Sequence, residues 1–392
     1  MPRALLLGCA LGLACLSARA ETIADLPTQD PEAPWPTDVW AEAAPRVPDA
    51  AALERAVDAL MDFEPGPVPQ TRAVLIVQGG RLVLERYADG FERRTRFVSW
   101  SMAKTVTQAM VGILVREGRL DLDAPPGIEL WQGPGDPRGA VTLRQLLQMT
   151  SGLANADRLP GPRGSQGFVS HMLFGAGSQD AARFAADVPL LHEPGSHWAY
   201  STGTSVILGA LVGDRARAAG EDIRAFAQRE LFGPIGMRSA IPELDAAGSF
   251  LGGAFVWATA RDWARFGLLY LRDGVWEQRR ILPEGWVAFS RTPSSAEGNR
   301  RHGAHLWINR GFETEEVQRA MPQLPETTFS AQGRGGQYVV MVPSKDLVVV
   351  RLGENGTGER RELSRRVGAV AAAFPEVSAP EVSAPVAGGP VE

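Results

Sequence analysis

A serine and a lysine three residues apart form the first pair in this sequence that could do chemistry. Ser101 and Lys104 lie in the stretch Val98-Ser-Trp-Ser-Met-Ala-Lys-Thr-Val106. If Ser101 opens a helix, Lys104 projects from the same face one turn later, so its amine can reach the serine hydroxyl. The serine would then meet the positive end of the helix dipole. Such a pair can act as a nucleophile and its base; otherwise Ser101 is a helix cap and Lys104 a surface residue.

The scarcity of lysine favours the chemical interpretation. Of 40 basic residues, only Lys104 and Lys345 are lysines. Arginine keeps its proton in proteins, whereas a desolvated lysine can lose it, so a lysine is expected where a proton must be transferred. Lys104 has apolar neighbours that could lower its pKa. Lys345 stands beside Asp346 in a polar turn, and we expect it to be a solvated surface residue.

Tyr200 is the third candidate, one of only four tyrosines. It follows the Pro194-Gly195 turn and precedes Ser201 and Thr202, residue types that begin helices. A phenol at such a loop end is exposed to a cleft, where it could ionise or shuttle a proton beside a lysine. The alternative is an aromatic side chain packed in the core.

The segment Gly333-Arg-Gly-Gly-Gln337 is rich in glycine within what is otherwise strand sequence. Clustered glycines in a strand allow close approach of a ligand, and the backbone N–H groups could bind a carbonyl oxygen as half of an oxyanion hole. The N–H of Ser101 would form the other half. Arg334 suits a substrate carboxylate. The alternatives are a β-bulge and an ordinary edge charge.

The elements that must position these residues follow from the hydrophobic periodicity. Strands are expected at both ends of the chain and helices between them, which predicts an α+β fold: one antiparallel sheet built from both termini, flanked by helices, with an inserted helical subdomain. A cleft is expected where the two parts meet. The expected strands are 73–77, 81–85 (with a Gly79-Gly80 turn), 327–331, 337–342 and 347–351, and the expected helices are 51–63, 101–117, 143–148, 201–219, 223–231, 260–272 and 358–374.

The two ends of the chain have compositions of their own. Residues 1–20 resemble a secretory signal: Arg3, a 13-residue apolar stretch, and a small-x-small site ending at Ala20. Its removal would take away both cysteines, Cys9 and Cys15, so the mature protein would be periplasmic or secreted and free of thiols. The alternatives are an uncleaved anchor and a lipoprotein at Cys15. Residues 21–48 are predicted to form a Pro-rich arm, and 375–392 a disordered Pro-rich tail.

Composition excludes several classes of protein. The net charge is −5 without a basic tract, which argues against nucleic acid as a partner. No apolar run is long enough to span a bilayer. The sequence has no Gly-x-Ser-x-Gly motif, which argues against an α/β-hydrolase. It has no HExxH, P-loop or dinucleotide motif either, so no metal or cofactor is expected. His302 and His305 could suggest a metal only by their spacing.

Together these motifs resemble the serine β-lactamase and penicillin-binding-protein superfamily. The similarity spans about residues 50–372 and is closest to the branch with class C β-lactamases, D-alanyl-D-alanine carboxypeptidases, esterases of that fold and 6-aminohexanoate-dimer hydrolase. It rests on three motifs in their order and spacing, supported by further matching stretches. The motifs are Ser101-Met-Ala-Lys104, Tyr200-Ser-Thr202 and Arg334-Gly335-Gly336, and the stretches are 142–153, 198–204 and 258–267.

The resemblance implies a β-lactamase/DD-peptidase-like catalytic domain at 49–374, with a sheet part at about 49–99 and 292–374 and a helical part at about 100–291. It implies Ser101 as the acylated nucleophile, Lys104 as its basic partner and Tyr200 as a proton relay. The oxyanion donors would be the N–H groups of Ser101 and Gln337, and the substrate-binding residues would be Thr202, Arg334, Gly335 and Gly336.

Two departures from the family pattern favour an ester or amide substrate over an antibiotic. Arg334 stands where β-lactamases usually have lysine, and Thr202 stands where they often have asparagine. A hydroxyl replaces an amide imperfectly as a partner for a substrate amide. The expectation is an exported, cofactor-free serine hydrolase for a small ester, amide or peptide. A D-Ala-D-Ala carboxypeptidase or penicillin-directed enzyme and a catalytically silent binding protein remain alternatives, and the oligomeric state is left open.

Overall fold

The computed structural model describes residues 26, 32–63, 70–157, 166–298, 301–310, 319–356 and 359–377. The predicted signal peptide at 1–20 lies outside the described residues, as do parts of the predicted arm and nearly all of the predicted tail. Among the helices that are described, none is long and apolar enough to cross a membrane.

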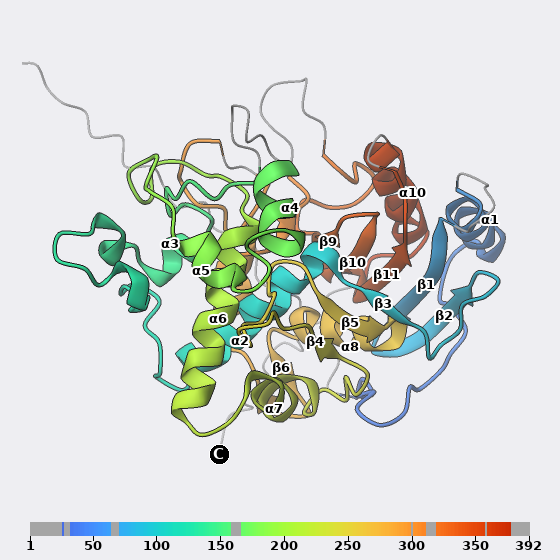
Figure 1. Ribbon diagram of the computed structural model, residues 1–392. Coiled ribbons are helices and arrows are strands. Elements are labelled where there is room, and N and C mark those ends of the chain that lie inside the picture. Colours follow the sequence, from blue (N-terminus) through green and yellow to red (C-terminus); the bar gives the residue numbers. More distant parts are fainter. Residues whose placement is uncertain are drawn as a thin grey trace, which may run out of the picture.

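The largest unit is a six-stranded sheet assembled from the two ends of the chain (Figure 1), in the order β2-β1-β11-β10-β9-β8. All of its pairings are antiparallel, and the N-terminal strand β1 lies between β2 and the C-terminal strand β11. The prediction of one antiparallel sheet built from both termini is therefore confirmed. The strands are β1 (Thr71–Gln78), β2 (Arg81–Tyr87), β8 (Trp307–Ile308), β9 (Phe329–Gly333), β10 (Gln337–Val342) and β11 (Leu347–Gly353).

Two of the predicted turns have the expected form, and one differs. Gly79 and Gly80 join β1 to β2 with φ angles of +57° and +73°, as a two-residue hairpin requires. A short 3₁₀ turn, Pro343–Lys345, joins β10 to β11. The glycine-rich segment, however, does not lie within a strand, because residues 334–336 form the turn between β9 and β10. Gly335 and Gly336 have φ angles of +72° and +79°, which end the extended conformation.

Helices cover both faces of this sheet, so its central strands β1, β10 and β11 are buried on both sides. On β10, Val339 and Met341 belong to the core beneath α8, while Val340 and Val342 belong to the core beneath α1 and α10. This alternation follows from the two-residue period of a strand. Figure 1 shows α1 and α10 beside each other at the sheet end of the molecule. The helices are α1 (Ala50–Met61), α8 (Ala260–Leu271) and α10 (Arg360–Ala372).

The contact between α8 and the sheet depends on Gly267. A Cβ atom at this position would lie 2.6 Å from Cγ1 of Val348 and 2.7 Å from Cγ1 of Val339. We expect Gly267→Ala to lower the free energy of unfolding by about 1–3 kcal/mol, measured by urea titration. Gly167→Ala is the matched control, because no atom lies within 4 Å of its added Cβ in helix α4 (Gln166–Phe174). Equal stability of the two variants would contradict the close packing.

The middle of the chain forms the helical part, as predicted (Figure 1). The expected helix 101–117 begins with a 3₁₀ turn, Trp100–Met102, before α2, and the expected helix 223–231 is α7 followed by a π turn, Gln228–Phe232. A second, three-stranded sheet with the order β3-β5-β4 was not predicted. The remaining elements are α2 (Ala103–Arg116), α3 (Leu143–Leu147), α5 (Ala181–Ala186), α6 (Thr202–Ala218), α7 (Ile223–Ala227), α9 (Trp286–Arg291), β3 (Arg96–Val98), β4 (Ile241–Pro242), β5 (Val256–Thr259), β6 (Val275–Trp276) and β7 (Arg279–Arg280).

The expectation that Lys345 is a solvated surface residue is wrong. Its side chain is buried, and its Nζ donates a hydrogen bond to the carbonyl oxygen of Phe374 after α10. Burial lowers the pKa of Lys345, while Glu376 opposes this effect. The turn looked polar in sequence, but the end of α10 covers it.

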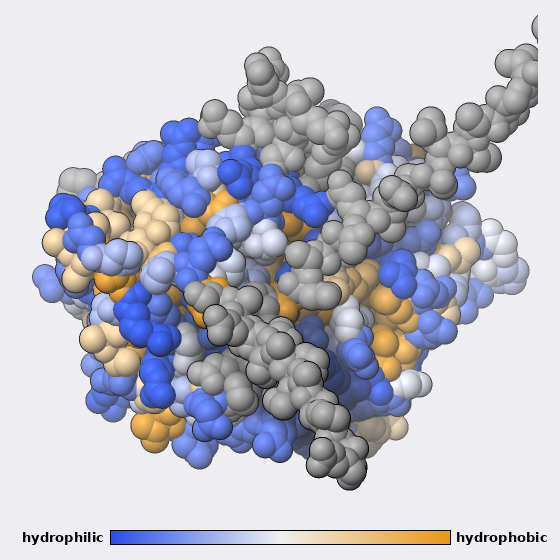
Figure 2. Space-filling model, turned by 180° about the vertical axis from the view of Figure 1, so that it is seen from behind, coloured by the Kyte–Doolittle hydropathy of each residue, from blue (hydrophilic) through white to orange (hydrophobic). Residues whose placement is uncertain are grey.

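The described part of the predicted arm, residues 32–48, packs on the domain. Trp40 is buried, and the backbone groups of Leu82 exchange hydrogen bonds with those of Ala41 and Ala43. Figure 2 shows the opposite side of the molecule, where hydrophilic residues predominate and hydrophobic residues form separate patches.

Candidate active site

A cavity of about 670 Å³ lies between the helical part and the glycine-rich end of the sheet. It is at the junction where the sequence predicted a cleft. Its lining comes from the turn before α2, the loop before α6, the β9–β10 turn and the chain around the start of α10. The lining residues are Ser101, Ala156, Asp157, His197, Trp198, Ala199, Tyr200, Trp307, Arg334, Gly335, Gly336, Asn355, Gly356, Arg360 and Leu363.

Ser101 sits in the 3₁₀ turn that precedes α2, directly after a strained residue. Trp100 has a φ of +44°, a conformation that is uncommon for bulky side chains. The turn is packed against the end of β9, where a Cβ at Gly333 would lie 2.3 Å from the carbonyl oxygen of Ser99. Only glycine therefore allows the β9–β10 turn to come so close to the serine.

Lys104 is buried on α2 and directs its amine at Ser101. Its Nζ donates to Oγ of Ser101 at 3.1 Å, to Oγ1 of Thr202 at 3.0 Å and to the carbonyl oxygen of Gly253 at 2.6 Å. Burial lowers the pKa of Lys104 from 10.5 to about 8, and the negative charge of Asp157 acts in the opposite direction. A substantial fraction of this amine is therefore neutral at slightly alkaline pH.

The three partners of Lys104 determine where a neutral amine would direct its lone pair. The carbonyl oxygen of Gly253 can only accept a hydrogen bond. The hydroxyl of Thr202 donates to Oδ2 of Asp157 at 2.7 Å, so towards Lys104 it can only accept. The two N–H groups of a neutral amine are therefore used by Gly253 and Thr202, and the lone pair faces the hydroxyl of Ser101. This arrangement is suited to removing the serine proton.

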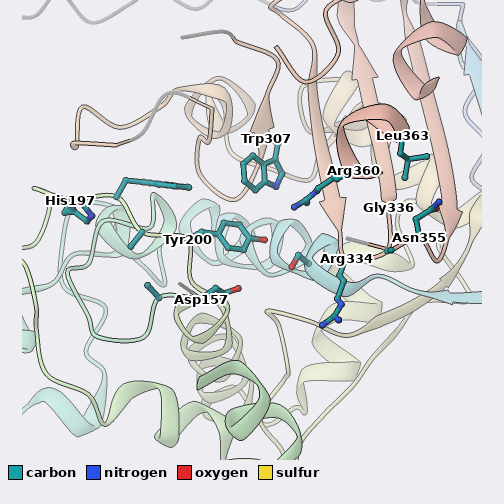
Figure 3. Close-up of a pocket in the computed structure, with 15 residues that line it drawn as sticks. Asp157, His197, Tyr200, Trp307, Arg334, Gly336, Asn355, Arg360 and Leu363 are labelled. Carbon is teal, nitrogen blue, oxygen red and sulfur yellow. The ribbon is translucent and has the colours of Figure 1, made fainter. Parts of the chain in front are cut away.

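Tyr200 completes the group at the edge of the cavity. The centre of its ring lies 5.0 Å from Nζ of Lys104, and its phenol shares a side-chain hydrogen bond with Ser101. Burial, followed by the charge of Asp157, raises its pKa, whereas the bond to Ser101 and the charge of Arg360 lower it by less. The phenol is thus neutral, which favours proton relay over ionisation. Figure 3 shows its hydroxyl directed towards the sheet side of the cavity, where Arg360 lies.

The other predicted site residues fall into two groups. Arg334, Gly335 and Gly336 line the cavity, but the side chain of Arg334 turns away from Arg360 (Figure 3) and its guanidinium lies 5.7 Å from the Trp100 ring centre. Thr202 is buried behind the cavity wall, between Lys104 and Asp157. Gln337 is not among the lining residues; it pairs with Gly333, and its side chain bonds the backbone of Gly353.

Asp157, Asn355 and Arg360 are among the lining residues that the sequence did not predict. Asp157 accepts hydrogen bonds from the N–H and the hydroxyl of Thr202, at 2.6 and 2.7 Å. Its N–H donates to the carbonyl oxygen of Tyr200. No local motif marks these three positions, because each lies far from Ser101 in sequence: Asp157 and Asn355 are in loops, and Arg360 is the first residue of α10.

The two histidines with metal-like spacing are both buried. Nε2 of His305 lies 2.7 Å from Oγ of Ser205, and its Nδ1 lies 2.7 Å from the carbonyl oxygen of Leu147. Because a carbonyl can only accept, Nδ1 carries the proton and Nε2 accepts from the serine. Burial lowers the pKa of His302 and His305 to about 3. Within the described ranges, no group of three or more potential ligands could hold a metal ion.

Comparison with known proteins agrees with this geometry. The model of the family described as Beta-lactamase matches residues 53–373. The chain belongs to the beta-lactamase family. It is similar to an uncharacterized protein of Mycobacterium tuberculosis, 28% identical over 319 residues, which cover 67% of this chain and 78% of that protein.

One further relative of this beta-lactamase family member, and one solved structure with a similar fold, are named for an activity. The 6-aminohexanoate-dimer hydrolase of Paenarthrobacter ureafaciens is 24% identical over 292 residues, covering 72% of each chain. The solved structure of EstCE1, a hydrolase with promiscuous acyltransferase activity, has a TM-score of 0.63 at 20% identity and covers 82% of this chain and 99% of that one. The predicted superfamily and its α+β fold are thereby confirmed, and the family is hydrolase-related.

Proposed function

We propose that this protein is an exported serine hydrolase that cleaves an ester or amide through a covalent acyl-enzyme on Ser101. The observation that carries the proposal is the buried amine of Lys104, 3.1 Å from Oγ of Ser101, with its pKa lowered to about 8. A serine hydroxyl needs such a base to become a nucleophile, and a base is most useful when its pKa is near the working pH.

In the proposed reaction, neutral Lys104 takes the proton of Ser101 as Oγ attacks the carbonyl carbon of the substrate. The oxygen of the tetrahedral intermediate takes up the negative charge and is bound by backbone N–H groups. The proton then passes from Lys104, through the neutral phenol of Tyr200, to the leaving alcohol or amine as its bond to carbon breaks. A water molecule then attacks the carbonyl carbon of the acyl-enzyme and gives a proton through Tyr200 to Lys104. The bond between this carbon and Oγ breaks, Lys104 returns the proton to Oγ of Ser101, and the acid is released.

The N–H of Ser101 remains our proposed first oxyanion donor. For the second donor, the lining of the cavity favours the N–H groups of the β9–β10 turn, beginning with Arg334, over that of Gln337. Gln337 lies opposite Gly333 in the β9–β10 pair and is not among the lining residues. We therefore propose the N–H of Arg334 as the second donor, and the N–H of Gln337 stays a prediction.

A fluorophosphonate probe tests the proposal directly. We expect the probe to label Ser101, identified by mass spectrometry of the tryptic peptides, and the label to block hydrolysis of p-nitrophenyl butyrate. Labelling at another serine, or hydrolysis that continues after stoichiometric labelling of Ser101, would contradict it.

Export is tested separately. The protein recovered outside the cytoplasm should begin at Glu21, and retention of residues 1–20 would contradict that part of the proposal.

A second candidate function is a carboxypeptidase or penicillin-directed activity. It is favoured by Asn355 and Arg360, which line the same cavity as Ser101 and could bind the terminal carboxylate of a peptide. A fluorescent penicillin should then label Ser101 stably. Rapid ester hydrolysis without any labelling by penicillin would exclude this candidate and leave the esterase or amidase proposal.

The charge of Asp157 gives a prediction for the pH dependence. Because Asp157 raises the pKa of Lys104, Asp157→Asn should lower it, and more of the amine is then neutral at a given pH. We expect kcat/KM for p-nitrophenyl butyrate to rise with pH through about 8 in the unaltered protein. In the variant, this rise should shift to lower pH by about 0.5–1 unit.

The control for this prediction is Asp214→Asn, which removes the same charge from an exposed ion pair with Arg217. Its profile of kcat/KM against pH should coincide with that of the unaltered protein. A shift to higher pH in Asp157→Asn, or an equal shift in both variants, would mean that Lys104 is not the group whose deprotonation activates the enzyme.

A further inference from the structure

Arg351 is a fully buried arginine whose role the proposed reaction does not explain. It lies on β11, in a run of otherwise apolar residues, and its side chain has no exposed surface. All of its N–H groups are used. Nε donates to Oγ1 of Thr71; Nη1 donates to the carbonyl oxygens of Gly335 (2.9 Å) and Gly336 (2.8 Å); Nη2 donates to Oγ1 of Thr71, to the carbonyl oxygen of Gln70 and to Oδ1 of Asn355.

These partners are unusual for a buried cation. Within the described part of the chain, none of the hydrogen-bond acceptors of Arg351 is a carboxylate. The charge of Glu354 acts on Arg351 without a hydrogen bond between them. Removing a positive charge from water without a hydrogen-bonded carboxylate is costly for folding, and a packed apolar side chain would avoid that cost. A benefit other than stability is therefore expected at this position.

The first structure that Arg351 holds is the β9–β10 turn in the wall of the cavity. Gly335 and Gly336 both line the cavity, and their carbonyl oxygens both point to Nη1 of Arg351. A Cβ at Gly336 would lie 2.8 Å from this same Nη1, so the guanidinium fills the space behind the turn. The turn has two consecutive residues in the left-handed region. Its other hydrogen bonds run from the N–H of Asn355 to the carbonyl oxygen of Gly335 and from Nε2 of Gln337 to the carbonyl oxygen of Arg334.

The second structure is the amide of Asn355. This residue lines the cavity, is 8% exposed, and its Nδ2 has no hydrogen-bond partner among the described residues. A guanidinium can only donate, so Oδ1 of Asn355 must face Arg351. The NH₂ group lies on the other arm of the amide and is directed away from Arg351. A buried donor without a partner is costly unless a ligand satisfies it.

We propose that Arg351 is a positioning residue of the active site, which fixes the glycine turn and the Asn355 amide so that Nδ2 of Asn355 donates a hydrogen bond to an oxygen atom of the bound substrate. This inference rests on the proposed function, since it concerns the substrate of the same cavity. Arg351 acts through its two partners and does not itself line the cavity.

Kinetics with p-nitrophenyl butyrate test the role of Asn355. Asn355→Asp keeps an oxygen for Arg351 and the shape of the side chain, but it replaces the NH₂ donor by an acceptor. We expect KM to rise about 5- to 50-fold with kcat changed less than about threefold, the loss expected for one buried hydrogen bond. Unchanged KM in Asn355→Asp would overturn the proposed contact with substrate.

The positioning role is tested with Arg351→Met and the control Arg265→Met. Arg265 is also buried, and it donates to the carbonyl oxygen of Pro36 and to Asp262, away from the residues that line the cavity. We expect Arg351→Met to raise KM at least as much as Asn355→Asp, and the double variant Arg351→Met with Asn355→Asp to add less than about twofold. The control should lower stability without raising KM.

A crystal structure of Arg351→Met gives a readout that does not depend on catalysis. The turn at 334–336 should be displaced, and the amide of Asn355 should take a second orientation. An unchanged turn and amide in that structure, or a KM no higher than in Arg265→Met, would overturn the inference while leaving the serine-hydrolase proposal intact. Absence of hydrolysis and of Ser101 labelling in the unaltered protein would instead defeat the proposed function, and the crystal structure would still decide the positioning role.

Discussion

Replacing Lys104 by arginine should lower kcat/KM for p-nitrophenyl butyrate by at least about 10³-fold. The substitution keeps the positive charge and the ability to donate hydrogen bonds, but a guanidinium remains protonated and cannot accept the proton of Ser101. The loss should persist up to pH 9.5, because no accessible pH would make the arginine a base. The measurement is the initial rate of hydrolysis from pH 6 to pH 9.5.

The chain offers a closely matched control in its only other lysine. Lys345 is also buried and also donates to a backbone carbonyl, but it lies at the β10–β11 turn. Lys345→Arg should therefore cost stability without a comparable loss of kcat/KM. Full activity in Lys104→Arg would contradict proton transfer by Lys104, whatever the outcome of the control.

Chemical restoration of the amine separates proton transfer from the size of the side chain. The protein starting at residue 21 contains no cysteine, so Lys104→Cys would carry the only thiol. Alkylating it with 2-bromoethylamine in the unfolded state and refolding returns an amine to the same position. Activity should rise at least about tenfold above that of the unmodified cysteine variant, and no rise in a correctly folded sample would contradict the proposed base.

Ser101→Ala is the second substitution with a large expected effect. It removes the atom that is proposed to form the acyl bond, so kcat should fall by about 10³- to 10⁶-fold and the fluorophosphonate adduct should disappear. The small change in volume should leave the fold intact, because Ser101 is only partly buried and lies in a short turn. Both the rate and the adduct are measured on the same preparation.

Ser290→Ala is the control for this substitution. Ser290 is fully buried on α9, hydrogen bonds Gln108 and the carbonyl oxygen of Trp286, and does not line the cavity. Its replacement should lower stability while keeping turnover and labelling. Unchanged ester turnover in Ser101→Ala would instead support the alternative of a binding protein, with hydrolysis arising elsewhere.

The order of the fold could be predicted because local patterns were strong. Gly79-Gly80 between two apolar strands predicts a tight hairpin, and the structure has it. The helix and strand boundaries at 143–147, 202–218 and 337–342 agree with the periodicity to within one or two residues. Side-chain period and turn residues act over a few neighbouring positions, so they can be read without knowing the tertiary contacts.

The errors occurred where distant parts of the chain decide the environment. Lys345 has polar neighbours in sequence, but the end of α10 buries it. The glycines at 335 and 336 were expected within a strand, yet they form a turn whose carbonyls are held by Arg351. Burial and hydrogen-bond partners depend on packing between elements, which a local pattern does not contain.

For the candidate site, the sequence alone was enough to predict the proximity of Ser101 and Lys104. A lysine three residues after a serine, in a chain almost without lysine, already predicts that the two side chains meet, because that separation is about one helical turn. Only the tertiary structure could decide which way the amine directs its lone pair and what else faces the cavity. Asp157 and Asn355 come from separate loops, Arg360 begins α10, and Gly253 approaches Lys104 from 149 residues away. The pKa of Lys104 and the environment of the substrate depend on these distances in space, which spacing along the chain does not encode.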